Sequence, residues 1–131
     1  MGWLGACAPM PVAAPPPPFA NIPTFQRAAY AGTRQRLDFL TTLRPDCSYM
    51  GPSNYHFLMR PQHGLVEFKS AQEPPAFLQS SIFYKCNDHR VGGVMMYFTP
   101  DRSFSGNDRF VIEWISPAGL LYSRKYEVAV K

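Results

Sequence analysis

The alternation of apolar and polar positions is clearest between residues 92 and 114, on either side of a short polar corner. One parity is filled before the corner by Val94, Met96 and Phe98, and after it by Phe110, Ile112 and Trp114. A period of two over five or more residues is typical of a pleated, partly buried strand. The corner itself is rich in Pro, Gly, Asn, Asp and Ser, which favour turns. This stretch therefore predicts two strands joined as a hairpin.

Shorter stretches of the same character predict the other strands. They span residues 25–30, 36–43, 55–60, 65–69, 77–86 and 120–131, with turn-forming residues between them. Residues 70–76 cannot form a central strand, because Pro74 and Pro75 have no N–H to donate to a ladder. Seven or eight short strands at this spacing predict an all-β fold, an Ig-like antiparallel β-sandwich, over residues 24–131.

Composition supports the same fold class. Hydrophobic residues make up 46% of the 131-residue chain and aromatic residues 15%, which is enough for one core and favours strands. Fourteen prolines, and the absence of any sustained spacing of apolar residues at i, i+3, i+4 and i+7, argue against a helical bundle.

The first 23 residues differ in composition and predict an extended, Pro-rich N-terminal arm. Cys7 follows Leu4-Gly5-Ala6, which resembles the lipobox of bacterial lipoproteins and makes Cys7 a candidate for lipidation. The alternative is a disordered tail with an accidental cysteine. Further along lie residues that hold polyproline II, a conformation that aromatic grooves bind: Pro15, Pro16, Pro17 and Pro18, followed by Phe19. The arm is thus either a tether or a partner-binding segment.

The net charge of +4 is modest, and the basic residues are scattered rather than gathered in a stripe. Nucleic-acid binding is not expected from this pattern. A mild attraction to an anionic membrane or polysaccharide fits it, as does an ordinary solvated surface.

Two motifs carry a resemblance to known proteins. Residues 60–66, RPQHGLV, resemble the P-x-H-G-x-V turn of bacterial Ig-like and cadherin-like surface domains. Residues 97–100, YFTP, with residues 104–110, FSGNDRF, resemble the signature that follows in those domains. With the strands around them, the motifs cover residues 55–131. The chain is also similar to short exported proteobacterial proteins of unknown role that add a cysteine pair to the pattern.

The motif residues are expected to shape turns. We expect Phe104 and Phe110 to cap the end of the sandwich, and Asp108 to accept backbone N–H bonds of the loop. Gly106 suits a positive φ, which other residues reach at a cost. The remaining turn residues are Pro61, His63, Gly64 and Pro100. His63 is expected to act as a hydrogen-bonding residue of its loop.

Cys47 and Cys86 are expected to form a disulfide, because each lies at the end of a predicted strand and the resemblance implies export. Two buried free thiols in a cytosolic protein are the alternative. A nucleophile–base pair such as Cys86 with His89 lacks a surrounding motif. The Cys, His and Asp spacings match neither zinc nor calcium sites. We therefore expect no enzyme, no metal and no cofactor.

The sequence predicts a non-catalytic exported protein of the periplasm or cell surface. Its expected role is that of a protein–protein interaction module or structural subunit of a cell-envelope assembly, with another envelope protein or a second copy as partner. A glycan-binding module is the alternative, in which Trp114, Tyr122 and Tyr126 would stack on sugars if they are exposed. A cysteine-dependent enzyme is a less favoured reading.

Overall fold

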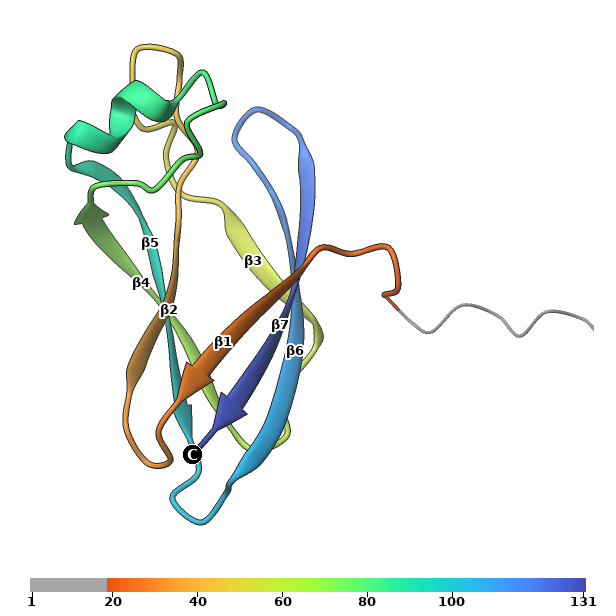
Figure 1. Ribbon diagram of the computed structural model, residues 1–131. Coiled ribbons are helices and arrows are strands. Elements are labelled where there is room, and N and C mark those ends of the chain that lie inside the picture. Colours follow the sequence, from red (N-terminus) through yellow and green to blue (C-terminus); the bar gives the residue numbers. More distant parts are fainter. Residues whose placement is uncertain (1–18) are drawn as a thin grey trace, which may run out of the picture.

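The computed structural model describes residues 19–131 and contains seven strands and one short 3-10 helix (Figure 1). The strands are β1 (Thr24–Ala29), β2 (Gln35–Leu40), β3 (Asn54–Met59), β4 (Gly64–Glu73), β5 (Val91–Pro100), β6 (Gly106–Ile115) and β7 (Leu121–Val130). The helix η1 (Tyr84–Asp88) lies between β4 and β5. Cys7 and the four consecutive prolines lie outside the described residues. No helix within residues 19–131 is long and apolar enough to cross a membrane.

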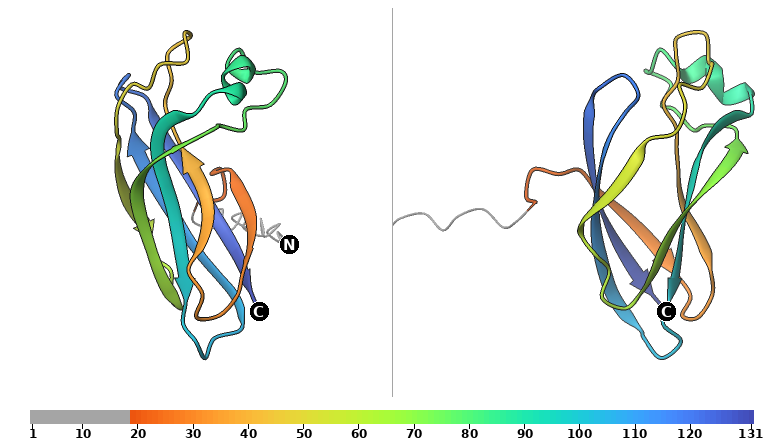
Figure 2. Two further views of the ribbon diagram at one scale, coloured as in Figure 1. Left: turned by 90° about the vertical axis from the view of Figure 1, so that its left-hand side faces the viewer. Right: turned by 180° about the vertical axis from the view of Figure 1, so that it is seen from behind.

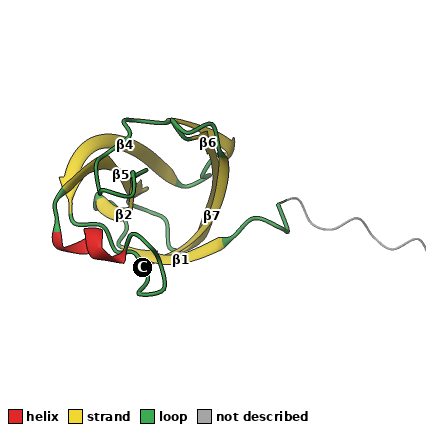
Figure 3. Ribbon diagram, turned by 90° about the horizontal axis from the view of Figure 1, so that it is seen from above, coloured by secondary structure: helices red, strands yellow, loops and turns green. Residues whose placement is uncertain are grey.

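The strands form two sheets that pack face to face. One sheet has the order β1-β7-β6-β3 and the other the order β2-β5-β4, and the view from above separates the two groups (Figure 3). Every pairing is antiparallel except that of β1 with β7, which is parallel. The grouping of second, fifth and fourth strands against third, sixth and seventh is that of an immunoglobulin sandwich. The predicted all-β, Ig-like fold is therefore confirmed.

The predicted hairpin at residues 92–114 is wrong, although both of its strands exist. β5 and β6 belong to different sheets and do not pair with each other. The connection at residues 101–105 carries the chain from one sheet to the other, so the apolar faces of the two strands meet across the core. Phe98 and Phe110 face each other there, with ring centroids 6.1 Å apart. Alternation alone does not distinguish a hairpin from such a corner, because both present one apolar face.

Phe110 lies in the centre of the core and does not cap the end of the sandwich as predicted. It is fully buried, stacks on Tyr126 at 5.1 Å and lies 6.3 Å from Phe57. Its position near the middle of β6, facing β5, places it between the two sheets. The side chains around it that are also fully buried are Met96, Phe98, Ile112 and Val128.

Residues 77–86 do not form the strand predicted there. They run as loop and turn into η1, with Phe77 and Phe83 packed inward and Leu78 and Ile82 exposed. The Asn87 side chain imitates a strand partner, accepting from the Phe77 N–H and donating to its carbonyl, both at 2.9 Å. The prediction of a strand relied on the number of apolar residues in this segment. These residues lack the period of two that is typical of a strand.

A second, smaller core lies beneath this segment at one end of the sandwich. It contains Leu43, Cys86 and Val91, with partly buried aromatic side chains packed around them. Gly93 has no side chain, which lets the Phe39 ring lie close to β5, since an added Cβ would be 2.5 Å from that ring. Residues 77–86 reach this core through Phe77 and Phe83, and β5 contributes Val91 to it.

Candidate functional site

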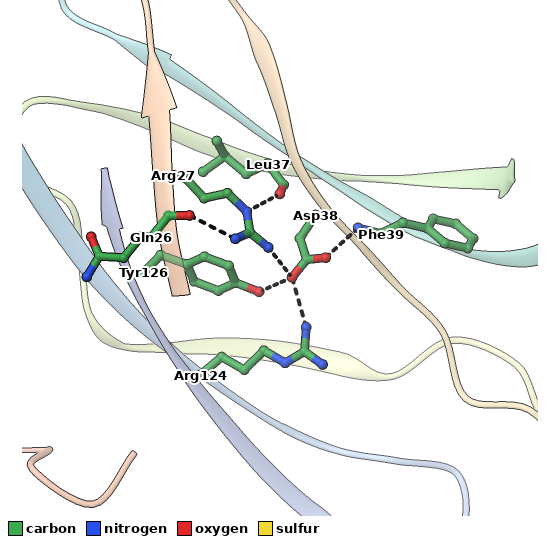
Figure 4. Close-up of polar contacts among 7 residues, drawn as sticks. All are labelled: Gln26, Arg27, Leu37, Asp38, Phe39, Arg124 and Tyr126. Atoms are coloured by element: carbon green, nitrogen blue, oxygen red, sulfur yellow. Dashed lines mark hydrogen bonds and ion pairs between the residues drawn. The ribbon is translucent and has the colours of Figure 1, made fainter. Parts of the chain in front are cut away.

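A polar network links the two sheets through Asp38 of β2 (Figure 4). Its Oδ2 atom accepts hydrogen bonds from the Tyr126 hydroxyl at 2.5 Å and from the Arg124 guanidinium at 2.8 Å, both on β7. Arg27 of β1 adds an ion pair at 3.7 Å, and its Nε atom donates to the Leu37 carbonyl at 2.8 Å. The Oδ1 atom accepts from the Phe39 N–H of the same strand at 3.0 Å. Both carboxylate oxygens are therefore engaged, Oδ2 by donors from the opposite sheet, and the arrangement stabilises the packing of the sheets rather than offering a free reactive group.

Aromatic rings hold the two arginines of this network. The Arg124 guanidinium lies over the Phe25 ring at 4.7 Å and over the Trp114 ring at 5.6 Å. Arg27 lies over Phe25 at 5.6 Å. Cation–π contacts of this kind are stronger when they are partly desolvated. The cluster therefore fixes the inward-facing side of β7.

The tyrosines near this network are held in their neutral form. Burial and the adjacent Asp38 carboxylate raise the pKa of Tyr126 above its ordinary value. Burial also raises the pKa of Tyr55 to about 12. Burial alone would lower the pKa of Arg124, but its contacts with Tyr126 and Asp38 outweigh that effect and raise it.

Replacing Asp38 is expected to weaken the domain far more than replacing a surface carboxylate. Asp38→Asn leaves two arginines half-buried without their carboxylate, and we expect a loss of about 2–3 kcal/mol in the free energy of unfolding. Glu67→Gln is the control, because its ion pairs with Arg34 and Lys69 are both 3.8 Å long and exposed, and we expect a loss below about 0.5 kcal/mol. Denaturant unfolding measures both. Equal losses in the two variants would show that the network contributes no more than a surface pair.

Alkaline pH is expected to destabilise the domain through Tyr55 and Tyr126. An unfolded tyrosine has a pKa of about 10, and both folded values are higher. The folded state thus holds these protons more tightly. The resulting stabilisation is complete below about pH 10 and is lost as the pH rises through the folded pKa values. Phenolate absorbance should show Tyr55 and Tyr126 among the last of the seven tyrosines to ionise. Tyr55→Phe should lessen the fall in stability between about pH 9 and about pH 12, and an unchanged fall would contradict this assignment.

Asp108 joins two loops at the other end of the sandwich. It is buried, and its carboxylate accepts from the backbone N–H of Gln62 at 3.1 Å and of His63 at 2.8 Å. Asp108 therefore braces two loops, the β3–β4 turn and the loop next to which it lies on β6. His63 bonds through its backbone, while its ring stacks on Phe104 at 3.9 Å. His63 is thus a hydrogen-bonding residue of its loop, as expected, through its N–H and carbonyl, and its ring adds the stacking contact.

The other turn residues lie around this cluster. Pro61 is in the β3–β4 turn, and Gly64 begins β4, where an added Cβ would be 2.6 Å from the Phe98 ring. Pro100 ends β5, and its carbonyl accepts from the Gly32 N–H at 2.9 Å. Gly106 has a φ of 132°, a conformation that favours glycine.

The predicted disulfide between Cys47 and Cys86 is confirmed. It ties the β2–β3 loop to η1, with Cys86 fully buried in the second core. Neither cysteine is then a free thiol, so the pairing of Cys86 with His89 offers no nucleophile in this state. Within residues 19–131 no group of three or more His, Cys, Asp or Glu side chains is placed to hold a metal ion.

Two of the three aromatic residues proposed for sugar stacking are buried. Trp114 and Tyr126 face the core, and only Tyr122 of the three is exposed. Positions 114, 122 and 126 all lie on the inner face of their sheet. Tyr122 is exposed because it lies near the end of the β6–β7 hairpin, where the core no longer covers that face. A flat aromatic platform for a glycan is therefore absent from this face.

The most exposed apolar surface of the sheets was not anticipated from the sequence. Ile115, Leu120 and Leu121 project from the end of the β6–β7 hairpin, which we call the β6–β7 tip (residues 115–121). The only signal for it is the absence of charge between Glu113 and Arg124. The Asp38 network was missed as well, because a single acidic residue in a strand is more often exposed than paired across a core.

Comparisons with known proteins yield little. No family model matches the sequence. No curated protein matches it either. Among solved structures the chain is similar to the solution structure of amebosin, with 11% identity and a TM-score of 0.40 over 82% of this chain and 88% of that chain. This similarity supports no statement about family, partner or activity.

Proposed function

We propose that the protein is a non-catalytic exported module that acts as an interaction partner or structural subunit of a cell-envelope assembly. The observation that carries this proposal is the disulfide between Cys47 and Cys86. Structural disulfides persist in oxidising compartments such as the periplasm and are rare in the cytosol. Cys7, which lies outside the described residues, would then be the site of lipid attachment to the membrane.

The sheet edge at β4 is the surface best suited to a protein partner. β4 pairs with β5 over ten residues without a register shift, whereas the β3 edge is shorter and irregular between Phe57 and Met59. A long, regular edge strand can accept an added strand, and irregularities hinder such pairing. Its outward charges are already matched, Glu67 with Arg34 and Lys69. A partner would therefore add a strand to β4.

Photo-cross-linking in the native host tests this proposal. A photoreactive residue in place of Leu65 on β4 should form an adduct with one recurring envelope protein or a second copy of this chain. The same residue in place of Leu58 on β3 is the control, since both leucines are exposed on edge strands of opposite sheets. Equal adduct formation at both positions would contradict the choice of edge. Recovery of the protein from the cytosol with no adduct would contradict the proposed function.

A further inference from the structure

The β6–β7 tip carries three exposed aliphatic side chains and no charge. Ile115, Leu120 and Leu121 are 61%, 55% and 63% exposed, and Ile115 and Leu121 stand opposite each other across the hairpin. Residues 114–123 include no charged side chain. Isolated exposed apolar residues are common, but three on one projecting turn form a surface that water solvates poorly.

Three backbone N–H groups of the tip are paired within it. The Ser116 N–H donates to the Leu120 carbonyl at 2.8 Å, and the Gly119 N–H donates to the Ser116 carbonyl at 2.8 Å. The Leu120 N–H donates to the Ser116 hydroxyl at 3.3 Å, and Pro117 has no N–H. These pairings lower the cost of removing the turn from water, because unpaired polar groups in an apolar phase are expensive.

Tyr122 lies next to the tip on β7, and its side chain is 42% exposed. Tyrosine is enriched at membrane–water interfaces, which suit its apolar ring and polar hydroxyl. Trp114, on which Tyr122 stacks at 5.4 Å, is buried, and Arg124 bonds Asp38, so neither contributes to this exposed surface.

The tip stands at one end of the sandwich in each view (Figures 1 and 2). β1 begins beside the middle of β7, because the Lys125 N–H donates to the Pro23 carbonyl at 2.9 Å and Thr24 pairs with Lys125.

We propose that the β6–β7 tip inserts into the surface of an anionic lipid bilayer. The tip projects outward and lacks charge, which suits a deformable apolar phase better than the polar rim of a protein interface. The net charge of +4 favours anionic headgroups. This inference goes beyond the proposed function and holds for the chain without any lipid on Cys7.

Vesicle binding tests the proposal with the purified, unacylated full chain. Phosphatidylglycerol–phosphatidylethanolamine vesicles should co-sediment the wild-type protein, at low salt and at high salt, whereas the Leu120→Asp/Leu121→Asp variant should bind at least about tenfold more weakly. Leu58→Asp is the matched control, since Leu58 is exposed but lies toward the end of β3 that is remote from Ile115, and it should bind as the wild type does. Unchanged thermal unfolding would show that both variants fold.

Three results would overturn the proposal: no binding by the wild type, undiminished binding by the double variant, or an equal loss in Leu58→Asp. Binding that is lost at high salt and is equally strong in the wild type and the double variant would indicate electrostatic adsorption in place of insertion. None of these results bears on export or on the disulfide, which are measured in the native host.

Discussion

Phe110→Ala should lower the free energy of unfolding by about 3–5 kcal/mol, among the largest effects of any single substitution in the described domain. The side chain is fully buried and lies against Phe57, Phe98 and Tyr126, which come from both sheets. Truncation removes the contacts of all three rings and leaves a cavity that two sheets cannot close without shifting. Denaturant unfolding followed by circular dichroism measures the loss.

The control for Phe110→Ala is Leu121→Ala, an exposed position for which we expect a change within about 0.5 kcal/mol. If Phe110→Ala fails to fold, Phe110→Leu serves as a milder variant with a smaller loss of the same sign. A loss below about 1 kcal/mol for Phe110→Ala would contradict the placement of this ring at the centre of the core.

Removing the disulfide should cost up to about 4 kcal/mol in the chain-entropy model, because the bond closes a loop between residues 39 positions apart. Cys47→Ala with Cys86→Ala should also loosen one region before the rest. Hydrogen exchange should accelerate first in residues 77–89, which are held over the second core by this bond. Protection in β6, at the centre of the main core, should change least.

Cys7→Ala is the matched control for the disulfide, since it removes a cysteine outside the described domain and should leave unfolding unchanged. Addition of reductant to the wild type should reproduce the behaviour of the double variant. Equal stability of the wild type and the double variant would contradict the role given to this bond, as would uniform exchange across the domain.

The sequence predicts the strands better than it predicts their pairing. Alternation at Phe110, Ile112 and Trp114 correctly places these residues on a buried face, because a period of two is a local property of the strand. The partner of a strand depends on the whole topology. For this reason a five-residue connection after Pro100 is read as a hairpin although it joins two sheets.

Residues 77–86 show a second limit of sequence prediction. Phe77 and Phe83 pack on a small core that contains Cys86 of the disulfide and the Phe39 ring, which lies close to β5 at Gly93. Neither feature is local to the segment, so the count of apolar residues favoured a strand that does not form.

The candidate site is visible in the sequence only in part. Pairing of Cys47 with Cys86 follows from cysteine count and an export context, and is confirmed. The link between Asp38 and Arg124 joins residues far apart in the chain, and no pattern within either strand indicates it. The exposure of the β6–β7 tip depends on where the sandwich ends, and no local pattern in the sequence indicates that position.

The thiol state of the protein in its native host tests the central claim most directly. Cells are treated with an alkylating reagent before lysis, the envelope and cytosolic fractions are separated, and the cysteine peptides are mapped without reductant. Our account predicts recovery from the envelope with Cys47 and Cys86 joined and unalkylated. Recovery from the cytosol with both thiols alkylated would contradict it.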